Sequence, residues 1–248
     1  MSDASLKDAV RDAYGRAALR VAAGAAPDCC RGTDCSAVEG NLYDPADLAT
    51  LPDQAVLGSL GCGNPTALAE LRAGDTVLDL GSGGGLDVLL SARRVAPGGM
   101  AYGLDMTDEM LTLARENQRR AGVTNAEFLK GDIEHIPLPE GSVDVIISNC
   151  VINLSADKPR VLAEAFRVLK PGGRLAVSDV IVQEDLPAAV RGDLEQWVGC
   201  VAGALEQRQF VALLGETGFE AIGIEPTRTY QIDGRVIGAF IRARKPTA

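Results

Sequence analysis

The segment DLGSGGG at residues 79–85 has the residue types needed to bind a ligand through the backbone. Apolar residues precede it and the helical pattern LDVLLSARRV follows, so we expect a turn between a strand and a helix. Glycines let the chain turn tightly and let a ligand lie against the peptide groups. A dinucleotide-binding turn, G-x-G-x-x-G, would require glycine at position 86, where the chain has Leu86. The pattern therefore disfavours a nicotinamide oxidoreductase.

Two more carboxylates follow segments that we predict as strands. Asp105 ends AYGLD and Asp132 comes shortly after AEFL. Ligands of open parallel sheets bind beyond the carboxyl ends of the strands, and a carboxylate at the end of the second strand can accept hydrogen bonds from both hydroxyls of a ribose. Taken singly, Asp105 is equally consistent with an acid that flanks a helix, and Asp132 with a turn residue. Together with the glycine turn, they predict one elongated ligand pocket.

The chain has six cysteines and a single histidine, His135. Cys150 follows the apolar run VDVIIS, Cys200 lies in VGCVAGAL and Cys62 lies in GCGNP. The glycine- and cysteine-rich stretch at 24–45 holds the other three, Cys29, Cys30 and Cys35. The pairs C-x₂-C of a zinc knuckle are absent. Each thiol taken alone could be a packing residue, but separated thiols can converge in a fold, and thiolates select soft, thiophilic ions.

The elements that would position these groups alternate regularly from residue 76 onwards. We expect strands at 76–80, 101–105, 126–129, 143–148 and 174–180, with helices at 86–95, 107–121 and 158–170. Such alternation predicts an α/β fold with a doubly wound, Rossmann-like parallel sheet. An amphipathic helix is expected at 5–21, either packed on the sheet or covering the ligand pocket. The last third is less regular, with helices expected at 188–202 and 206–217 and strands at 219–224, 228–232 and 236–242.

Composition limits the possible partners. Hydrophobic residues make up 46% of 248 residues, enough for a packed core, and the net charge is −10. Nucleic acids and anionic membranes require basic surfaces, so neither is expected as a partner. No apolar run approaches the length of a membrane span, and MSDASLKDAV lacks the apolar core of a signal peptide. We therefore expect a cytoplasmic protein with mostly reduced thiols and a small-molecule substrate.

The acidic residue two positions before the first glycine resembles the first motif of class I S-adenosylmethionine-dependent methyltransferases. The resemblance implies that the turn holds the methionine part of S-adenosylmethionine, that Asp105 binds the ribose, and that Asp132 binds the adenine amino group with Ile133 beside the ring. The cofactor-binding residues implied in this way are Asp79, Gly81, Ser82, Gly83, Gly85, Asp105, Met106, Asp132, Ile133 and Asn149.

A narrower resemblance is carried by SNCVINLSADKPRVLAEAFRVLKPGGRLAVSDV with the later VGCVAGAL and the earlier GCGNP. These segments are similar to the arsenite methyltransferase family, over about residues 6–222. The resemblance implies that cysteine thiolates matching Cys62, Cys150 and Cys200 hold trivalent arsenic, as arsenite or methylarsenite. A further cysteine of the N-terminal loop would take part in the redox cycle. We expect Cys35 in that role, with Cys29 or Cys30 as alternatives, and glutathione or thioredoxin as the thiol reductant.

The resemblance also suggests how the chain is organised. We expect an N-terminal helical and loop extension with cysteines at 1–72, a cofactor-binding Rossmann-like core at 73–182, and the C-terminal part of the same domain at 183–248, with substrate-side helices and final strands. Longer members of the family carry a further cysteine-rich domain after this point.

Two alternatives remain open from the residues alone. One is a methyltransferase of a small organic acceptor, such as a quinone ring carbon. Amine methyltransferases often carry N-P-P-Y after the fourth strand. This chain has Asn149-Cys150-Val151-Ile152 there, without the prolines and the tyrosine, so the pattern disfavours an amine as the acceptor. The other is a thiolate trap that binds arsenic without turnover. Methylation of arsenic, in contrast to that of an oxygen or carbon acceptor, needs no general base, because the lone pair on arsenic loses no proton when it attacks the methyl group. The reaction is therefore compatible with a chain that has a single histidine.

Overall fold

The computed structural model describes residues 3–25, 43–61, 63–184, 186–229 and 236–247. Among the described residues, four helices precede the first strand: α1 (Asp3–Ala22), α3 (Pro45–Leu48), α4 (Asp53–Leu57) and α5 (Pro65–Leu68). The alternating core follows, with β1 (Thr76–Leu80), α6 (Leu86–Arg94), β2 (Met100–Asp105), α7 (Asp108–Ala121), β3 (Ala126–Lys130), β4 (Val143–Asn149), the 3₁₀ turn η1 (Ile152–Leu154), α8 (Lys158–Val168) and β5 (Leu169–Val182). The chain continues with α9 (Ala188–Arg191), α10 (Leu194–Val198), β6 (Leu205–Glu206), α11 (Gln207–Thr217), β7 (Glu220–Thr229) and β8 (Val236–Arg244).

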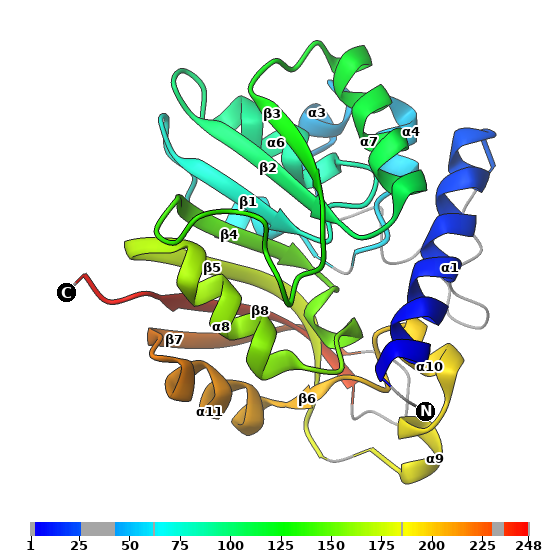
Figure 1. The fold of residues 1–248 in the computed structure, drawn as a ribbon, viewed down its shortest axis with the longest axis vertical. Coiled ribbons are helices and arrows are strands. Elements are labelled where there is room, and N and C mark those ends of the chain that lie inside the picture. Colours follow the sequence, from blue (N-terminus) through cyan, green and yellow to red (C-terminus); the bar gives the residue numbers. More distant parts are fainter. Residues whose placement is uncertain (1–2, 26–42, 62, 185, 230–235, 248) are drawn as a thin grey trace.

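One sheet connects these strands, in the order β3-β2-β1-β4-β5-β8-β7, with the short β6 paired to β5 (Figure 1). β1 to β5 are parallel, and β8 runs antiparallel to both β5 and β7. The strands that follow β1 in the sequence, β2 and β3, lie on one side of it in the sheet, whereas β4 and β5 lie on the other side. The connections that follow β1 and β4 therefore run in opposite directions along the sheet. Such a switch point opens a crevice at the carboxyl ends of the strands. The expected α/β fold with a Rossmann-like parallel sheet is confirmed.

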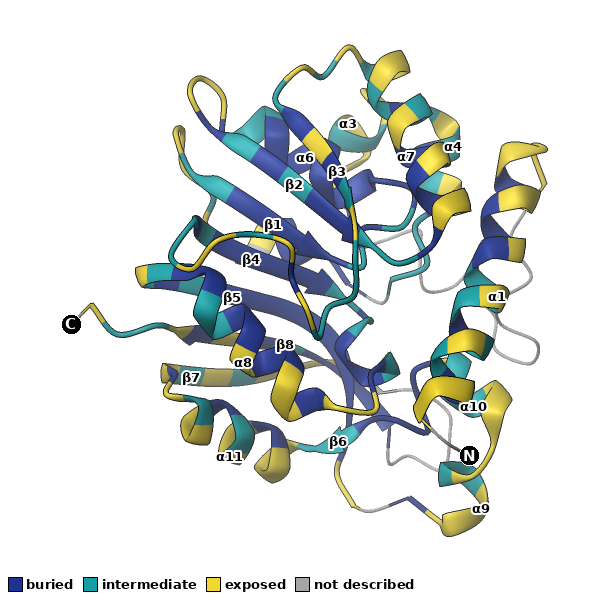
Figure 2. Ribbon diagram, in the orientation of Figure 1, coloured by how far each residue is buried: buried dark blue, intermediate teal, exposed yellow. Residues whose placement is uncertain are grey.

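Alternate residues of each strand feed two separate apolar layers, as strand geometry requires. Leu78 of β1 packs in one cluster with Val161 of α8 and Phe210 of α11. Its neighbour Val77 packs in another cluster with Val95, which follows α6. α8 and α11 therefore cover one face of the sheet and α6 the other. The burial colours in Figure 2 show the consequence: the central strands are dark blue, while α8 and α11 are yellow on their outer faces.

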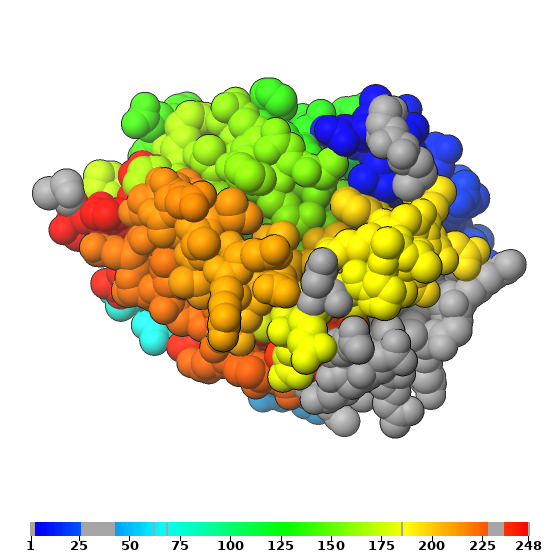
Figure 3. All heavy atoms as spheres, turned by 90° about the horizontal axis from the view of Figure 1, so that it is seen from below, coloured from blue at the N-terminus to red at the C-terminus, as the bar shows by residue number. Residues whose placement is uncertain are grey.

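Helix α1 lies beside this layered core, next to α7 and α10 (Figure 1). Its buried side chains include Leu6, Val10 and Val21, and the hydroxyl of Tyr14 donates to the carbonyl oxygen of Val198 at 3.4 Å. Figure 3 shows the blue α1 adjoining the yellow segment that contains α10. No helix of the described residues is both long enough and apolar enough to cross a membrane.

The C-terminal third departs most from the expected elements. The single helix expected at 188–202 is two short helices, α9 and α10. The first ends at Gly192, and the side chain of Asp193 then caps a new helix by accepting from the backbone N–H groups of Glu195 and Gln196. The strands expected at 219–224 and 228–232 form one irregular strand, β7, as far as it is described.

Candidate cofactor and thiol site

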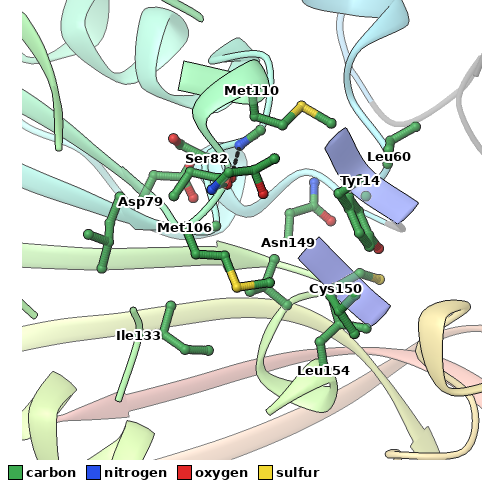
Figure 4. A pocket seen from close by; sticks show the side chains of 18 of the residues that line it. Tyr14, Leu60, Asp79, Ser82, Met106, Met110, Ile133, Asn149, Cys150 and Leu154 are labelled. Carbon is green, nitrogen blue, oxygen red and sulfur yellow. Dashed lines mark hydrogen bonds between the residues drawn. The ribbon is translucent and has the colours of Figure 1, made fainter. Parts of the chain in front are cut away.

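A cavity of about 960 Å³, including the open space at its mouth, lies at the switch point of the sheet. The ends of β1, β2 and β4, the segment 58–61 and the inner face of α1 line it (Figure 4). Most of the expected cofactor residues face this cavity, namely Asp79, Gly81, Ser82, Gly83, Asp105, Met106, Asp132, Ile133 and Asn149. Gly85 does not line it. It precedes α6 and lies under the ring of Phe128, which would be 2.8 Å from an added Cβ atom.

The glycine turn presents polar groups that are left without partners. Asp79 and Ser82 are buried, and Asp79 Oδ1 and Ser82 Oγ have no hydrogen-bond partner. Burial raises the pKa of Asp79 well above its usual range, and the neighbouring Asp87 and Asp105 add to the shift. A cationic, hydrogen-bonding ligand in the cavity would satisfy both observations, because it would offset the cost of a buried negative charge.

Asp105 connects the second strand to the glycine turn. Its Oδ2 accepts from the backbone N–H of Gly83 at 2.9 Å, and its Oδ1 accepts from that of Thr107 at 2.9 Å. Burial raises the pKa of Asp105, and these backbone hydrogen bonds oppose the shift. Asp105 also lines the cavity, where its carboxylate oxygens face the space that a ligand's hydroxyl groups would occupy.

Asp132 faces the cavity together with a residue that the sequence did not single out. Lys7 of α1 places its Nζ 3.0 Å from Asp132 Oδ2 and 3.1 Å from Glu134 Oε2. Burial lowers the pKa of Lys7, but the hydrogen bonds to the two carboxylates outweigh this and raise it. Val10 and Tyr14, one and two turns further along, also line the cavity. Helix α1 therefore forms one wall of it.

Asn149, at the end of β4, belongs to a buried polar network. Its Nδ2 lies 3.1 Å from the hydroxyl oxygen of Tyr43 and 3.3 Å from Asp87 Oδ2. The Tyr43 hydroxyl donates to Asp87 Oδ1 at 2.9 Å. Burial raises the pKa of Asp87 to about 6, although the hydrogen bonds from Tyr43 and Asn149 oppose the shift. Neither Tyr43 nor Asp87 could be identified from its sequence pattern, because a lone tyrosine in a loop and an acid in the first turn of a helix are common surface features.

Cys150 and Cys200 meet although fifty residues separate them. The Cys200 thiol donates to the carbonyl oxygen of Cys150 at 2.8 Å, and Cys150 lines the cavity. Both residues have left-handed backbones, with φ of 59° and 66°. Among the described non-glycine residues, only Glu70 and Ala221 share this property. Holding a non-glycine residue there costs about 1–3 kcal/mol, and such strain clusters at functional sites.

The other four cysteines, Cys29, Cys30, Cys35 and Cys62, lie outside the described residues. Cys150 is disulfide-bonded, and its sulfur partner also lies outside the described part of the chain. Its thiolate is therefore generated only when a reductant opens this bond.

A buried charged pair lies behind the two cysteines. Lys158 is buried, donates to the carbonyl oxygen of Ser155 at 2.8 Å and lies over the ring of Trp197, 5.3 Å from its centroid. Burial lowers the pKa of Lys158 to about 8, and it raises the pKa of the neighbouring Asp179 to about 7. His135, by contrast, is exposed and does not line the cavity.

Comparisons with known proteins agree with this geometry. Residues 71–218 match a family described as "Methyltransferase domain". The arsenite methyltransferase of Halobacterium salinarum is 44% identical over 230 residues, which are 88% of this chain and 59% of the relative. The human arsenite methyltransferase is 35% identical over 69% of this chain and 48% of its own length. The chain thus spans about half to three fifths of the curated relatives that it matches.

A solved structure gives the corresponding result in three dimensions. The arsenic(III) S-adenosylmethionine methyltransferase of Chlamydomonas reinhardtii is 36% identical, with a TM-score of 0.71 over 81% of this chain and 72% of the other. The chain therefore belongs to the methyltransferase-domain family and, within it, to the arsenite methyltransferase family.

Proposed function

We propose that this protein transfers a methyl group from S-adenosylmethionine to trivalent arsenic held by cysteine thiolates. The observation that carries the proposal is the contact between Cys200 and Cys150 at the end of the cavity wall formed by β4. Two cysteines from distant segments that meet at a cofactor pocket are difficult to explain by packing alone. The named relatives support the choice of arsenic as substrate.

The described residues fit the proposed cofactor. The unpartnered Asp79 Oδ1 and Ser82 Oγ would receive the polar end of its methionine part, and Asp105 would bind the ribose hydroxyls. Asp132 and Ile133 would contact the adenine, with Met106 beside them. The bound cofactor would supply an activated methyl group on a positively charged sulfur, and the buried carboxylates around Asp79 favour that positive charge.

The thiolates of Cys62, Cys150 and Cys200 would replace the three hydroxyl groups of arsenite. Each exchange forms an As–S bond and breaks an As–O bond, and the proton lost by the thiol leaves with the hydroxide as water. Three sulfurs leave one lone pair on arsenic, directed away from them. The protein's contribution is to align this lone pair with the methyl group, which is worth roughly 7–11 kcal/mol of the barrier. No proton is lost in the transfer, so the exposed His135 is not required.

The redox balance requires a thiol reductant. When the lone pair forms the As–C bond, arsenic becomes formally pentavalent and must regain two electrons before the next transfer. Two thiols can supply them by forming a disulfide. We propose Cys35 as the additional thiol, with Cys29 or Cys30 as alternatives, and glutathione or thioredoxin as the reductant that reopens the disulfide.

The experiment combines purified, reduced protein with arsenite, glutathione and methyl-labelled S-adenosylmethionine. Labelled methylarsenicals are expected, and Cys150→Ser or Cys200→Ser should abolish them while leaving the affinity for S-adenosylhomocysteine intact. Transfer to an organic acceptor that is indifferent to Cys150→Ser would identify a different methyltransferase. Arsenic binding without consumption of the cofactor would identify a trap.

A further inference from the structure

Asn149 makes a paired contact with the loop that precedes β1. Its Oδ1 accepts from the backbone N–H of Gly63 at 3.1 Å, and its Nδ2 donates to the carbonyl oxygen of the same residue at 2.7 Å. The side chain amide thus bonds both polar groups of one residue, as a neighbouring strand would. This arrangement fixes both the position and the orientation of the loop backbone at Gly63.

The network behind Asn149 holds the other end of the same loop. Asn149 Nδ2 also faces the hydroxyl of Tyr43 and Asp87 Oδ2. Tyr43, which donates to Asp87, is hydrogen-bonded to the side chain of Ser59. The segment 59–63 is therefore tied at both ends to one buried network, which is anchored in the first turn of α6.

The close approach explains the two glycines of GCGNP. A Cβ atom on Gly61 would lie 2.1 Å from Asn149 Cγ, and one on Gly63 would lie 1.7 Å from Ser178 Oγ. Contacts this short require the loop or the contacting side chains to move. Glycine on each side of Cys62 thus allows the loop to lie directly against Asn149 at the end of β4 and Ser178 of β5.

We propose that Asn149 is a positioning residue, which docks the loop carrying Cys62 against β4, next to Cys150. The inference rests on the proposed function, since it assigns a purpose to bringing a third thiol to the pair formed by Cys150 and Cys200. It differs from the role of cofactor contact that the family resemblance implies for Asn149. The two hydrogen bonds to Gly63 occupy the amide oxygen and one amide hydrogen, and the second hydrogen faces Tyr43 and Asp87.

The test compares Asn149→Ala with a matched control, Asn125→Ala. Asn125 Nδ2 donates to the carbonyl oxygens of Ala92 and Gly99, so its truncation also removes two bonds to backbone, but outside the cavity lining. Reduced proteins are loaded with arsenite, and the number of sulfur ligands is measured by X-ray absorption at the arsenic edge. We expect three sulfurs for the wild type and Asn125→Ala and two for Asn149→Ala, with arsenite bound at least tenfold more weakly by Asn149→Ala.

Two further measurements separate positioning from other roles. The Cys62→Ser variant should show the same loss of one sulfur, and adding Asn149→Ala to it should cause no further loss, because both changes remove the same ligand. The affinity for S-adenosylhomocysteine should stay within about twofold in Asn149→Ala. Three sulfurs in Asn149→Ala, or a large loss of S-adenosylhomocysteine affinity with arsenic coordination unchanged, would overturn the proposal.

A readout without arsenic keeps the inference independent of the proposed function. Hydrogen exchange at the amide of Gly63 should accelerate at least tenfold in Asn149→Ala and stay unchanged in Asn125→Ala. If the wild type binds no arsenic, the proposed function fails, and the exchange result still decides whether Asn149 docks the loop. Unchanged exchange at Gly63 in Asn149→Ala would show that it does not.

Discussion

The thiol of Cys200 lies 2.8 Å from the carbonyl oxygen of Cys150, although Cys150 precedes β5 in the sequence and Cys200 follows it. Cys150 is further held by its backbone N–H, which donates to the carbonyl oxygen of Ser178 in β5 at 2.8 Å. Cys200 is held by its own N–H, which donates to the carbonyl oxygen of Trp197 at 2.9 Å. The backbone of each cysteine is thus held by a hydrogen bond to a neighbouring segment or turn.

This relationship makes Trp197 a reporter of arsenic binding. Trp197 is the chain's single tryptophan, its Nε1 donates to the carbonyl oxygen of Leu154 at 3.1 Å, and it lies three residues before Cys200. A heavy atom bound to Cys200 should quench its fluorescence. We expect a saturable decrease when reduced protein is titrated with arsenite. Cys200→Ser should remove most of the decrease, and an equal decrease in that variant would contradict binding at Cys200.

The core of the fold could be predicted from the sequence because its signals are local. The residues of β1 form an apolar run that ends in a glycine turn, and α7 begins after Thr107 and ends before Gly122, as its sequence pattern indicates. The division into α9 and α10 was not predicted, because apolar residues occur on both sides of Gly192. The helix is interrupted where the side chain of Asp193 caps the start of α10. The sequence pattern alone does not show whether the apolar helical periodicity or the capping side chain prevails at such a position.

The site was predictable only in part, for a related reason. Asp105 was found because parallel strands place their carboxyl ends at one edge, so a strand-final carboxylate has a known location. Lys7 and Tyr43 come from segments that have no periodic relation to the sheet. The place of Lys7 at the cavity wall and that of Tyr43 beside Asp87 depend on tertiary packing of α1 and of the loop before α3, which no spacing in the sequence encodes.

Asp105→Ala should weaken cofactor binding. The change removes the acceptors of the Gly83 and Thr107 backbone N–H groups and the acceptor proposed for the ribose hydroxyls. Hydrogen bonds to a charged group are worth about 1.5–3 kcal/mol each, so we expect at least a tenfold loss of S-adenosylhomocysteine affinity, measured by calorimetry. The matched control is Asp108→Ala, because Asp108 pairs with the exposed Lys130 and does not line the cavity. Equal affinities in the two variants would exclude Asp105 from the cofactor site.

Lys7→Ala should loosen α1 without destabilising the core. Lys7 is partly exposed, so its ion pairs with Asp132 and Glu134 contribute at most about 1 kcal/mol. We expect faster hydrogen exchange in residues 3–22, with the global midpoint of urea unfolding nearly unchanged. Arg11→Ala is the matched control, since Arg11 pairs with Asp8 inside the same helix. Faster exchange in both variants alike would mean that Lys7 does not secure α1 to the cavity wall.

The buried Asp179 should make the protein's stability depend on pH. Burial raises its pKa to about 7 in the folded protein, while the ordinary value is 3.8. Between these values the folded state keeps a proton that the unfolded state has lost, so the free energy of unfolding falls as pH rises from about 4 to 7, by about 1.4 kcal/mol per pH unit at most. Asp179→Asn removes this titration. The stability of the variant relative to the wild type should therefore increase from pH 5 to pH 7, as measured by urea unfolding.

The substitution also has a cost that does not depend on pH, and the two effects can be separated. Asp179 Oδ1 accepts from Val180 N–H and from Asn153 Nδ2, and Oδ2 accepts from Asn153 N–H at 3.3 Å. An asparagine keeps one acceptor oxygen, so at least the longest of these bonds is lost at every pH. The buried Lys158 also loses a nearby carboxylate, which lowers its pKa further and makes stability rise with pH, in the same direction. A stability difference that stays constant from pH 5 to pH 7 would show that Asp179 is ionised in the folded protein throughout this range.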